Sequence, residues 1–273
     1  MNPIELSQLI EKKLNLEFND LSKQFFSEDN KSTSRFFILD NVLPADLALK
    51  IYNNFPTKNT FNYRKTFRER KYTYKKLDTI VGPIVNDITN SFQMDNVIKV
   101  IESITNTKNL TSDASLYAGG ISRMDIGHFL NPHIDNSHDA KRKRYRRFNL
   151  LYYVTPDICE LDGGNLEVWD KEVKIPLKIE SMFNRLVVLE TTKYSRHSVD
   201  KVLSDINRCC VSNYYFSVES PENNEYYHVT SFVGRPEEKI KRFYGVIDNF
   251  LRNNFSKVTG ISRKRKSIRT KKD

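Results

Sequence analysis

From about residue 115 to residue 218, the sequence is a series of short apolar segments separated by polar turns. Each segment is short enough to be a β-strand, and the run Asp162-Gly163-Gly164-Asn165 marks a turn between two of them. Many short strands at this spacing are typical of a sandwich or a jelly roll. The expected strands are residues 116–124, 128–135, 148–155, 165–169, 185–189 and 209–217.

The segments on either side of this region have a helical pattern. An apolar stripe, in which Leu14, Phe18, Leu21 and Phe25 recur every three or four residues, predicts a helix within the first 27 residues. A short strand is expected at 36–39, and further helices are expected from Pro44 and at 83–92 and 95–105. A last helix is expected after Pro236, with an apolar face formed by Ile240, Phe243, Tyr244, Ile247 and Leu251.

The net charge of +10 is concentrated in three segments. Residues 141–147 read KRKRYRR and contain no acidic residue, while residues 61–76 mix Lys and Arg with Phe and Tyr. The tail at 261–273 is also strongly basic, so the remainder of the chain is net acidic. Local basic segments suggest anionic partners at particular places, although a solvated surface is the common explanation for any one of them.

One short motif could bind a metal. His133-Ile134-Asp135 is the only His-x-Asp in the chain, and His197 follows it 64 residues later. On a strand, positions i and i+2 point to the same face, so His133 and Asp135 would converge there. Two imidazoles and one carboxylate on one face of an octahedron are typical of non-haem Fe(II) oxygenases.

The segments around this motif resemble a known family. His133-x-Asp135 is followed by FNLLYYVT, GGNLEVW, RLVVLE, RHSV and then Arg208. This order and spacing, over roughly half the chain, resembles the catalytic core of the 2-oxoglutarate/Fe(II) dioxygenases of the prolyl-hydroxylase-like type. The resemblance implies a double-stranded β-helix, which is a jelly-roll barrel with iron near its mouth.

The resemblance assigns roles to individual residues. It implies that His133, Asp135 and His197 bind Fe(II), and that Arg208 binds the far carboxylate of 2-oxoglutarate. A buried dicarboxylate needs a permanently charged, forked donor, which arginine supplies. Tyr153 is the best match for a tyrosine that helps to bind this carboxylate.

Two positions match the family less closely. Cys210 stands where the family often has a serine, which puts that contact in doubt. Arg123, ten residues before His133, is a further candidate for contact with the cofactor.

The implied fold is mainly β with helical additions. Its expected parts are an N-terminal helical region with a short strand at 1–114, a double-stranded β-helix catalytic core at 115–218, a C-terminal extension with a helix at 219–260 and a basic tail at 261–273. The implied reaction uses Fe(II), 2-oxoglutarate and O2, with ascorbate as a candidate reductant, and yields succinate and CO2. Asp135 favours hydroxylation or demethylation, because halogenating relatives lack this carboxylate.

The basic segments suggest an anionic substrate. The segment 136–147 follows the metal motif directly, so in this architecture it would lie beside the barrel mouth. We expect a nucleotide-linked sugar, an acidic glycan or a protein side chain as the substrate. Two alternatives are a nucleic-acid demethylase of the same superfamily and a non-catalytic jelly-roll module that binds polyanions. The demethylases carry a second arginine six residues after the first, where this chain has Tyr214.

The sequence also predicts a cytoplasmic location. No segment approaches the roughly 18 apolar residues that a membrane span needs, and the N-terminus lacks the apolar stretch of a signal peptide. The three cysteines, Cys159, Cys209 and Cys210, are odd in number and are expected to be reduced.

Overall fold

The structure is a computed structural model that describes residues 1–28, 32–75, 81–113, 116–117, 119–222, 224–239 and 242. The expected apolar face of the last helix and the basic tail at 261–273 lie outside the described residues.

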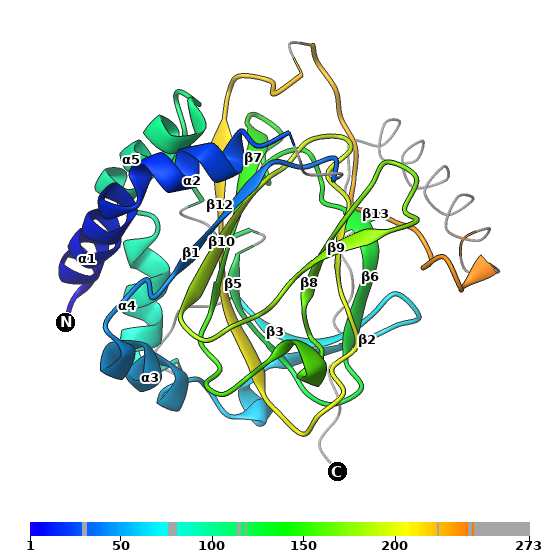
Figure 1. Ribbon diagram of the computed structural model, residues 1–273, viewed down its shortest axis with the longest axis horizontal. Helices are drawn as coiled ribbons and strands as arrows, with labels where there is room; N and C mark the ends of the chain where they lie inside the picture. The colour runs from blue at the N-terminus through cyan, green and yellow to red at the C-terminus, as the bar shows by residue number, and fades with distance from the viewer. Residues whose placement is uncertain are drawn as a thin grey trace.

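A curled antiparallel sheet dominates the described chain (Figure 1). Its main path runs in the order β1-β10-β7-β12-β5-β3-β6-β11-β8-β9. The strands along this path are β1 (Phe36–Asp40), β3 (Glu69–Tyr74), β5 (Gly120–Met124), β6 (Phe129–Ile134), β7 (Tyr145–Tyr153), β8 (Leu166–Trp169), β9 (Pro176–Ile179), β10 (Arg185–Glu190), β11 (His197–Val199) and β12 (Arg208–Ser217). The strands that pair beside this path are β2 (Asn62–Lys65), β4 (Thr111–Ser112) and β13 (Ser231–Phe232).

The pairing is that of a jelly roll. Strands β10-β7-β12-β5 form one sheet of the barrel, and β6-β11-β8-β9 form the facing sheet. Strand β3 pairs with both β5 and β6, and so joins the two sheets along one side. The expectation of a mainly β fold with a double-stranded β-helix core is therefore confirmed.

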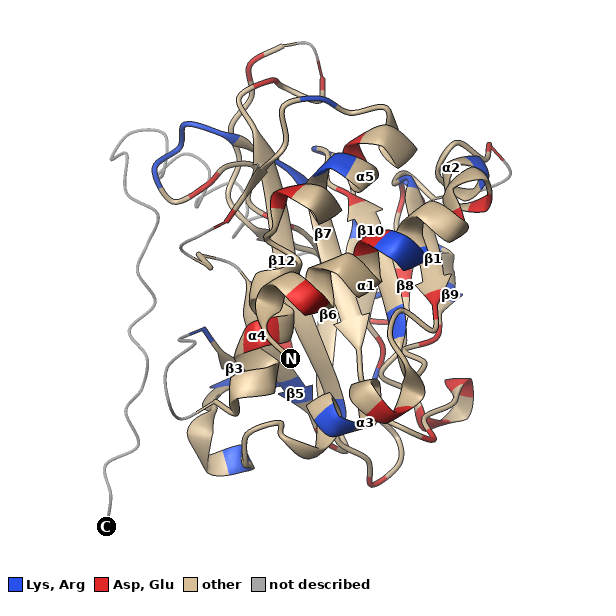
Figure 2. Ribbon diagram, turned by 90° about the vertical axis from the view of Figure 1, so that its left-hand side faces the viewer, with Lys and Arg blue, Asp and Glu red and all other residues tan. Residues whose placement is uncertain are grey.

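Helices cover the outer face of the β10-β7-β12-β5 sheet (Figure 2). Alternation along β7 explains why: Phe148, Leu150 and Tyr152 are buried among the helices, while Asn149 and Tyr153 point into the barrel. The helices are α1 (Pro3–Leu16), α2 (Phe18–Phe25), α3 (Ala45–Asn53), α4 (Pro83–Ser91) and α5 (Asp95–Thr105), with short 3₁₀ turns at Lys58–Thr60 and Glu160–Asp162.

Some boundaries differ from the sequence-based expectations. The first apolar stripe belongs to two helices, because the chain leaves helical geometry at Glu17. The first core strand begins at Gly120, whose φ of +116° is a conformation that L side chains rarely adopt. Residues 61–76 were expected only as a basic segment, but most of them form the β2–β3 hairpin, and β3 is a wall of the barrel. The division of the chain at residue 115 stays a prediction.

Candidate active site

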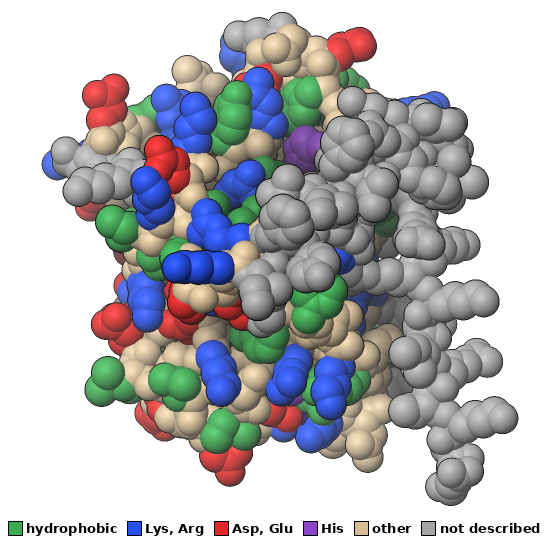
Figure 3. All heavy atoms as spheres, turned by 90° about the vertical axis from the view of Figure 1, so that its right-hand side faces the viewer, with side chains coloured by type: hydrophobic (Ala, Val, Ile, Leu, Met, Phe, Trp, Pro, Cys, Tyr) green, Lys and Arg blue, Asp and Glu red, His purple; other side chains and the backbone are tan. Residues whose placement is uncertain are grey.

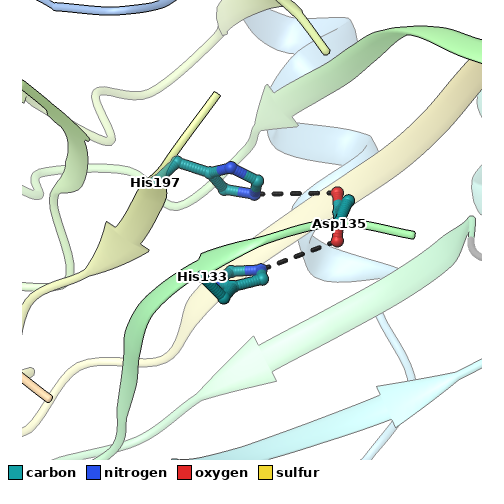
Figure 4. A group of neighbouring side chains, drawn as sticks. All are labelled: His133, Asp135 and His197. Carbon is teal, nitrogen blue, oxygen red and sulfur yellow. Dashed lines mark ion pairs between the residues drawn. The ribbon is translucent and has the colours of Figure 1, made fainter. Parts of the chain in front are cut away.

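The structure brings the three predicted metal ligands together (Figure 4). His133 lies on β6, Asp135 follows the end of that strand, and His197 begins β11 directly opposite His133. One ligand atom from each residue lies within 4.8 Å of the other two. The Nε2 atoms of His133 and His197 are 3.6 and 3.7 Å from the two Asp135 carboxylate oxygens.

Backbone carbonyls fix the tautomer of both histidines. The Nδ1 of His133 is 3.0 Å from the carbonyl oxygen of Asn131, and the Nδ1 of His197 is 3.2 Å from that of Ser195. A carbonyl oxygen can only accept, so each Nδ1 carries the proton of the neutral ring and donates it. Each Nε2 then presents a lone pair to the carboxylate, and this cluster of acceptors fits a cation.

Two neighbours hold Asp135 in its ionised form. The Arg146 Nη1 donates to Asp135 Oδ2 at 2.9 Å, and the Asn149 Nδ2 donates to the same oxygen at 2.8 Å. Burial opposes ionisation, but the Arg146 guanidinium and the two histidines hold the pKa of Asp135 well below its usual range. Asp135 Oδ1 accepts from neither neighbour, which leaves it available to a metal.

Arg146 differs from the rest of the basic run 141–147. Its side chain is 1% exposed, whereas the Arg144 side chain, which pairs with Asp139 at 2.9 Å, is 30% exposed. A register shift between β12 and β7 beside Arg147 turns Arg146 into the barrel, where its guanidinium lies 4.2 Å from the centre of the Tyr214 ring.

The same substitution at Arg146 and at Arg144 should have different effects on the stability of the protein. Arg146→Met should destabilise the metal-free protein by about 3–5 kcal/mol, because it leaves the buried Asp135 carboxylate without its cation. Arg144→Met should cost less than about 1 kcal/mol, because its ion pair is more accessible to water. Urea unfolding with and without Mn(II) measures both values, and the metal should recover much of the Arg146→Met loss. Equal losses in the two variants would contradict this role of Arg146.

Burial also lowers the pKa of two histidines near the barrel mouth. Burial and the neighbouring His133 lower the pKa of His197 to about 4, and burial lowers that of His228 to about 4. A folded-state pKa below the unfolded value contributes stability that is present above pH 6.5 and is lost as the pH falls towards 4.

We therefore expect the metal-free protein to lose stability between pH 6.5 and pH 4. The free energy of unfolding should fall by up to about 1.4 kcal/mol per pH unit for each of the two histidines. Urea titrations at several pH values measure this slope, and His228→Asn should reduce it by one histidine's share. A constant free energy of unfolding from pH 7 to pH 5 would refute the expectation.

A second group of residues fits a carboxylate. Arg208 is 4% exposed at the start of β12, and its guanidinium carbon lies 4.8 Å from the centre of the Tyr153 ring. Its Nε donates to the Gly164 carbonyl and to the Ser181 hydroxyl. Within the described chain no carboxylate lies within ion-pair distance of Arg208. The buried Tyr153 hydroxyl makes no hydrogen bond of normal geometry, although the Ser181 hydroxyl lies near enough to interact with it.

The turn before β8 makes room for this arginine. Gly164 has φ +74°, and a Cβ atom there would lie 2.7 Å from Cδ of Arg208. Burial raises the pKa of Tyr153, so its hydroxyl stays protonated and can donate. A buried guanidinium without an ion-pair partner, beside a hydroxyl that can donate, therefore fits one end of a dicarboxylate.

The structure also shows where Cys210 and Arg123, the two positions that match the family less closely, lie in the barrel. Cys210 points into the barrel with Tyr153, and burial raises the pKa of its thiol. Arg123 lies opposite Cys209, on the helix-covered face, and donates to Asp125 and Asn207. The suggestion that Arg123 reaches the cofactor was therefore wrong, because the alternation of β5 points it away from the barrel.

The barrel core of this chain matches a known protein family. Residues 119–216 match the family model of the 2OG-Fe(II) oxygenase superfamily. The prolyl 4-hydroxylase from Phytophthora capsici is similar in structure, with 13% identity, a TM-score of 0.52 and coverage of 92% of this chain and 77% of that one. This likeness shows the fold.

Two further structures are similar at lower scores. A prolyl hydroxylase from Trichoplax adhaerens, in complex with a hypoxia inducible factor peptide fragment, has 18% identity and a TM-score of 0.45, covering 77% of this chain and 91% of that one. A Pseudomonas putida prolyl-4-hydroxylase has 16% identity and a TM-score of 0.48, covering 75% and 98%. None of the curated protein sequences matches the chain. No helix in the described part of the chain is long and apolar enough to cross a membrane.

Proposed function

We propose a specific reaction for this 2-oxoglutarate/Fe(II) oxygenase of the prolyl-hydroxylase-like type: hydroxylation of a C–H bond in an anionic substrate. In this proposal His133, Asp135 and His197 bind Fe(II), while Arg208 and Tyr153 bind the far carboxylate of 2-oxoglutarate. The observation that carries it is the convergence of two oriented Nε2 lone pairs and one carboxylate in a buried site. When bound, iron with 2-oxoglutarate and O2 supplies the oxidising power, and succinate and CO2 are released.

The chain's own residues bind and orient the reactants. The carbonyls of Asn131 and Ser195 hold the two imidazoles in the tautomer that binds a metal. Arg146 and Asn149 occupy one oxygen of Asp135 and so direct the other towards the metal. Arg208, unpaired within the described chain, would charge-pair with the carboxylate and fix the direction of 2-oxoglutarate in the barrel.

Succinate formation without added substrate tests the proposed chemistry. The protein is loaded with Fe(II) and 2-oxoglutarate without oxygen, and succinate is measured after oxygen is admitted. We expect slow turnover that requires Fe(II), 2-oxoglutarate and O2. If no succinate forms and calorimetry detects no 2-oxoglutarate binding, the proposed roles fail.

The anionic nature of the substrate is supported by the charges around the site. On the face of the barrel that β6 and β13 occupy, Lys and Arg side chains are spread from the upper to the lower part, with Asp and Glu side chains among them (Figure 3). Lys71 of β3 interacts electrostatically with Asp135, so it lies on the metal side of the barrel wall. A positive potential beside the metal favours a negatively charged substrate.

Ionic strength tests this part of the proposal. For any compound that stimulates succinate formation, we expect KM to rise several-fold between about 20 and 200 mM salt, because the Debye length shortens over this range. A neutral analogue of the same compound serves as the control. A KM that does not change with salt would contradict an anionic substrate.

The two alternatives are less well supported. The position of the second arginine in nucleic-acid demethylases is occupied by Tyr214, whose ring packs against Arg146. A binding module without catalysis has no use for three oriented metal donors. We therefore retain the hydroxylase as the proposed function.

A further inference from the structure

One wall of the barrel carries cations that the proposed chemistry does not use. Side chains of β3 alternate, and Tyr72 and Tyr74 are buried in the core beneath the helices. Lys71 therefore belongs to the opposite face, towards the barrel interior. Lys75, just beyond the strand, continues this face and is exposed to solvent. The electrostatic interaction between Lys71 and Asp135 agrees with this direction.

A third cation joins these lysines from β2. Arg64 lies directly opposite Lys71 in the hairpin, so both side chains share one face. The buried Glu69 carboxylate is 3.8 Å from the Arg64 Nη1 and 3.5 Å from the Lys71 Nζ. Lys75 makes no ion pair with the described residues, and its Nζ donates to the carbonyl of Tyr117.

The positive charge of this wall exceeds the negative charge. Glu69 is the one described carboxylate within ion-pair distance of these three side chains, which leaves two positive charges in excess of the ion-paired negative charge. Asp113 attracts Lys75, and Asp135 attracts Lys71, only from beyond ion-pair distance. Burial and repulsion from Arg64, Arg146 and Lys71 lower the pKa of Lys75 to about 8. Like charges held together in a partly buried wall are unfavourable, and a bound dianion would relieve this repulsion.

We propose that Arg64, Lys71 and Lys75 form a binding site for a phosphate monoester group of the substrate. This inference rests on the proposed function and makes its substrate class specific. A phosphate monoester is a dianion near neutral pH, which matches the two excess charges, and its oxygens can accept from one forked guanidinium and two ammonium groups. Because Lys71 interacts with both Glu69 and Asp135, the phosphate site adjoins the metal site, as a substrate that carries both the phosphate and the oxidised carbon requires.

Phenyl phosphate is the probe for this site. It is titrated by calorimetry, without oxygen, into protein loaded with Mn(II) and 2-oxoglutarate, so that the Arg208 pocket is already filled. Benzoate, with one negative charge, and neutral benzyl alcohol are the comparison ligands. Lys75→Met and Arg64→Met remove cations from the site, while Lys141→Met removes an exposed lysine from the 136–147 segment and is the matched control.

We expect phenyl phosphate to bind the wild-type protein at least about tenfold more tightly than benzoate. The dissociation constant should rise at least about tenfold in Lys75→Met and in Arg64→Met, and should not change in Lys141→Met. No binding to the wild-type protein, or equal binding to Lys75→Met, would overturn the inference. Succinate formation by the wild-type protein distinguishes a failure of the phosphate site from a failure of the proposed function. If succinate forms but phenyl phosphate does not bind, only the phosphate site is refuted. If no succinate forms, the proposed function is refuted.

Discussion

Replacing His133 with alanine should abolish succinate formation in the absence of substrate. The variant retains one imidazole and one carboxylate, and the loss of one of three protein ligands should weaken Mn(II) binding by more than about 100-fold. The effect should be on metal binding, because the Arg208 pocket lies elsewhere in the barrel and is unchanged. Calorimetric Mn(II) titration and succinate measurement on the same samples check this.

His128→Asn is the matched control for this experiment. His128 is also buried, and its Nδ1 accepts from the backbone N–H of Asp125, a bond that an asparagine oxygen can replace. Its ring stacks on Tyr63, away from the metal site. This variant should bind Mn(II) and form succinate like the wild-type protein. Turnover that survives in His133→Ala would refute the proposed iron site.

The jelly-roll core was predictable because its strands are long and apolar. Residues 148–155 and 209–217 alternate between faces that are both buried, one beneath helices and one inside the barrel, so both strands were recognisable. The strand of three residues at β11 is too short for any periodicity, although His197 within it was identified from the family spacing. Strand β3 was missed because its inward face is charged, and charged residues at alternate positions are typical of an exposed segment.

The residues that hold the Asp135 carboxylate were less accessible to sequence reasoning. The basic run 141–147 was interpreted as lining the substrate entrance, yet Arg146 is buried and bound to Asp135. Strict alternation would place Arg147, not Arg146, on the same face as Asn149, and the irregular pairing of β7 with β12 reverses this. A bulge of this kind leaves no mark in a single sequence, so its consequence for the metal ligand became visible only in the structure.

Replacing Arg208 with methionine should raise the 2-oxoglutarate concentration needed for half-maximal turnover by about 100-fold. The expected loss, about 3 kcal/mol, is that of removing one partner from a buried, charge-assisted hydrogen-bonded pair. Methionine keeps much of the apolar volume against the Tyr153 ring, so the fold should be retained. Turnover at saturating 2-oxoglutarate should fall much less, because the metal ligands are untouched.

Two comparisons make the Arg208 experiment specific. Arg208→Lys keeps the charge but loses the forked geometry, so its 2-oxoglutarate requirement should lie between those of the wild-type protein and Arg208→Met. Tyr153→Phe removes only the hydroxyl, and should raise the 2-oxoglutarate requirement by roughly three- to tenfold, the value of about one hydrogen bond. Mn(II) affinity should be unchanged in all three variants. If Arg208→Met needs no more 2-oxoglutarate than the wild-type protein, the unpaired guanidinium in the barrel must have another partner, and the assignment of the co-substrate pocket is wrong.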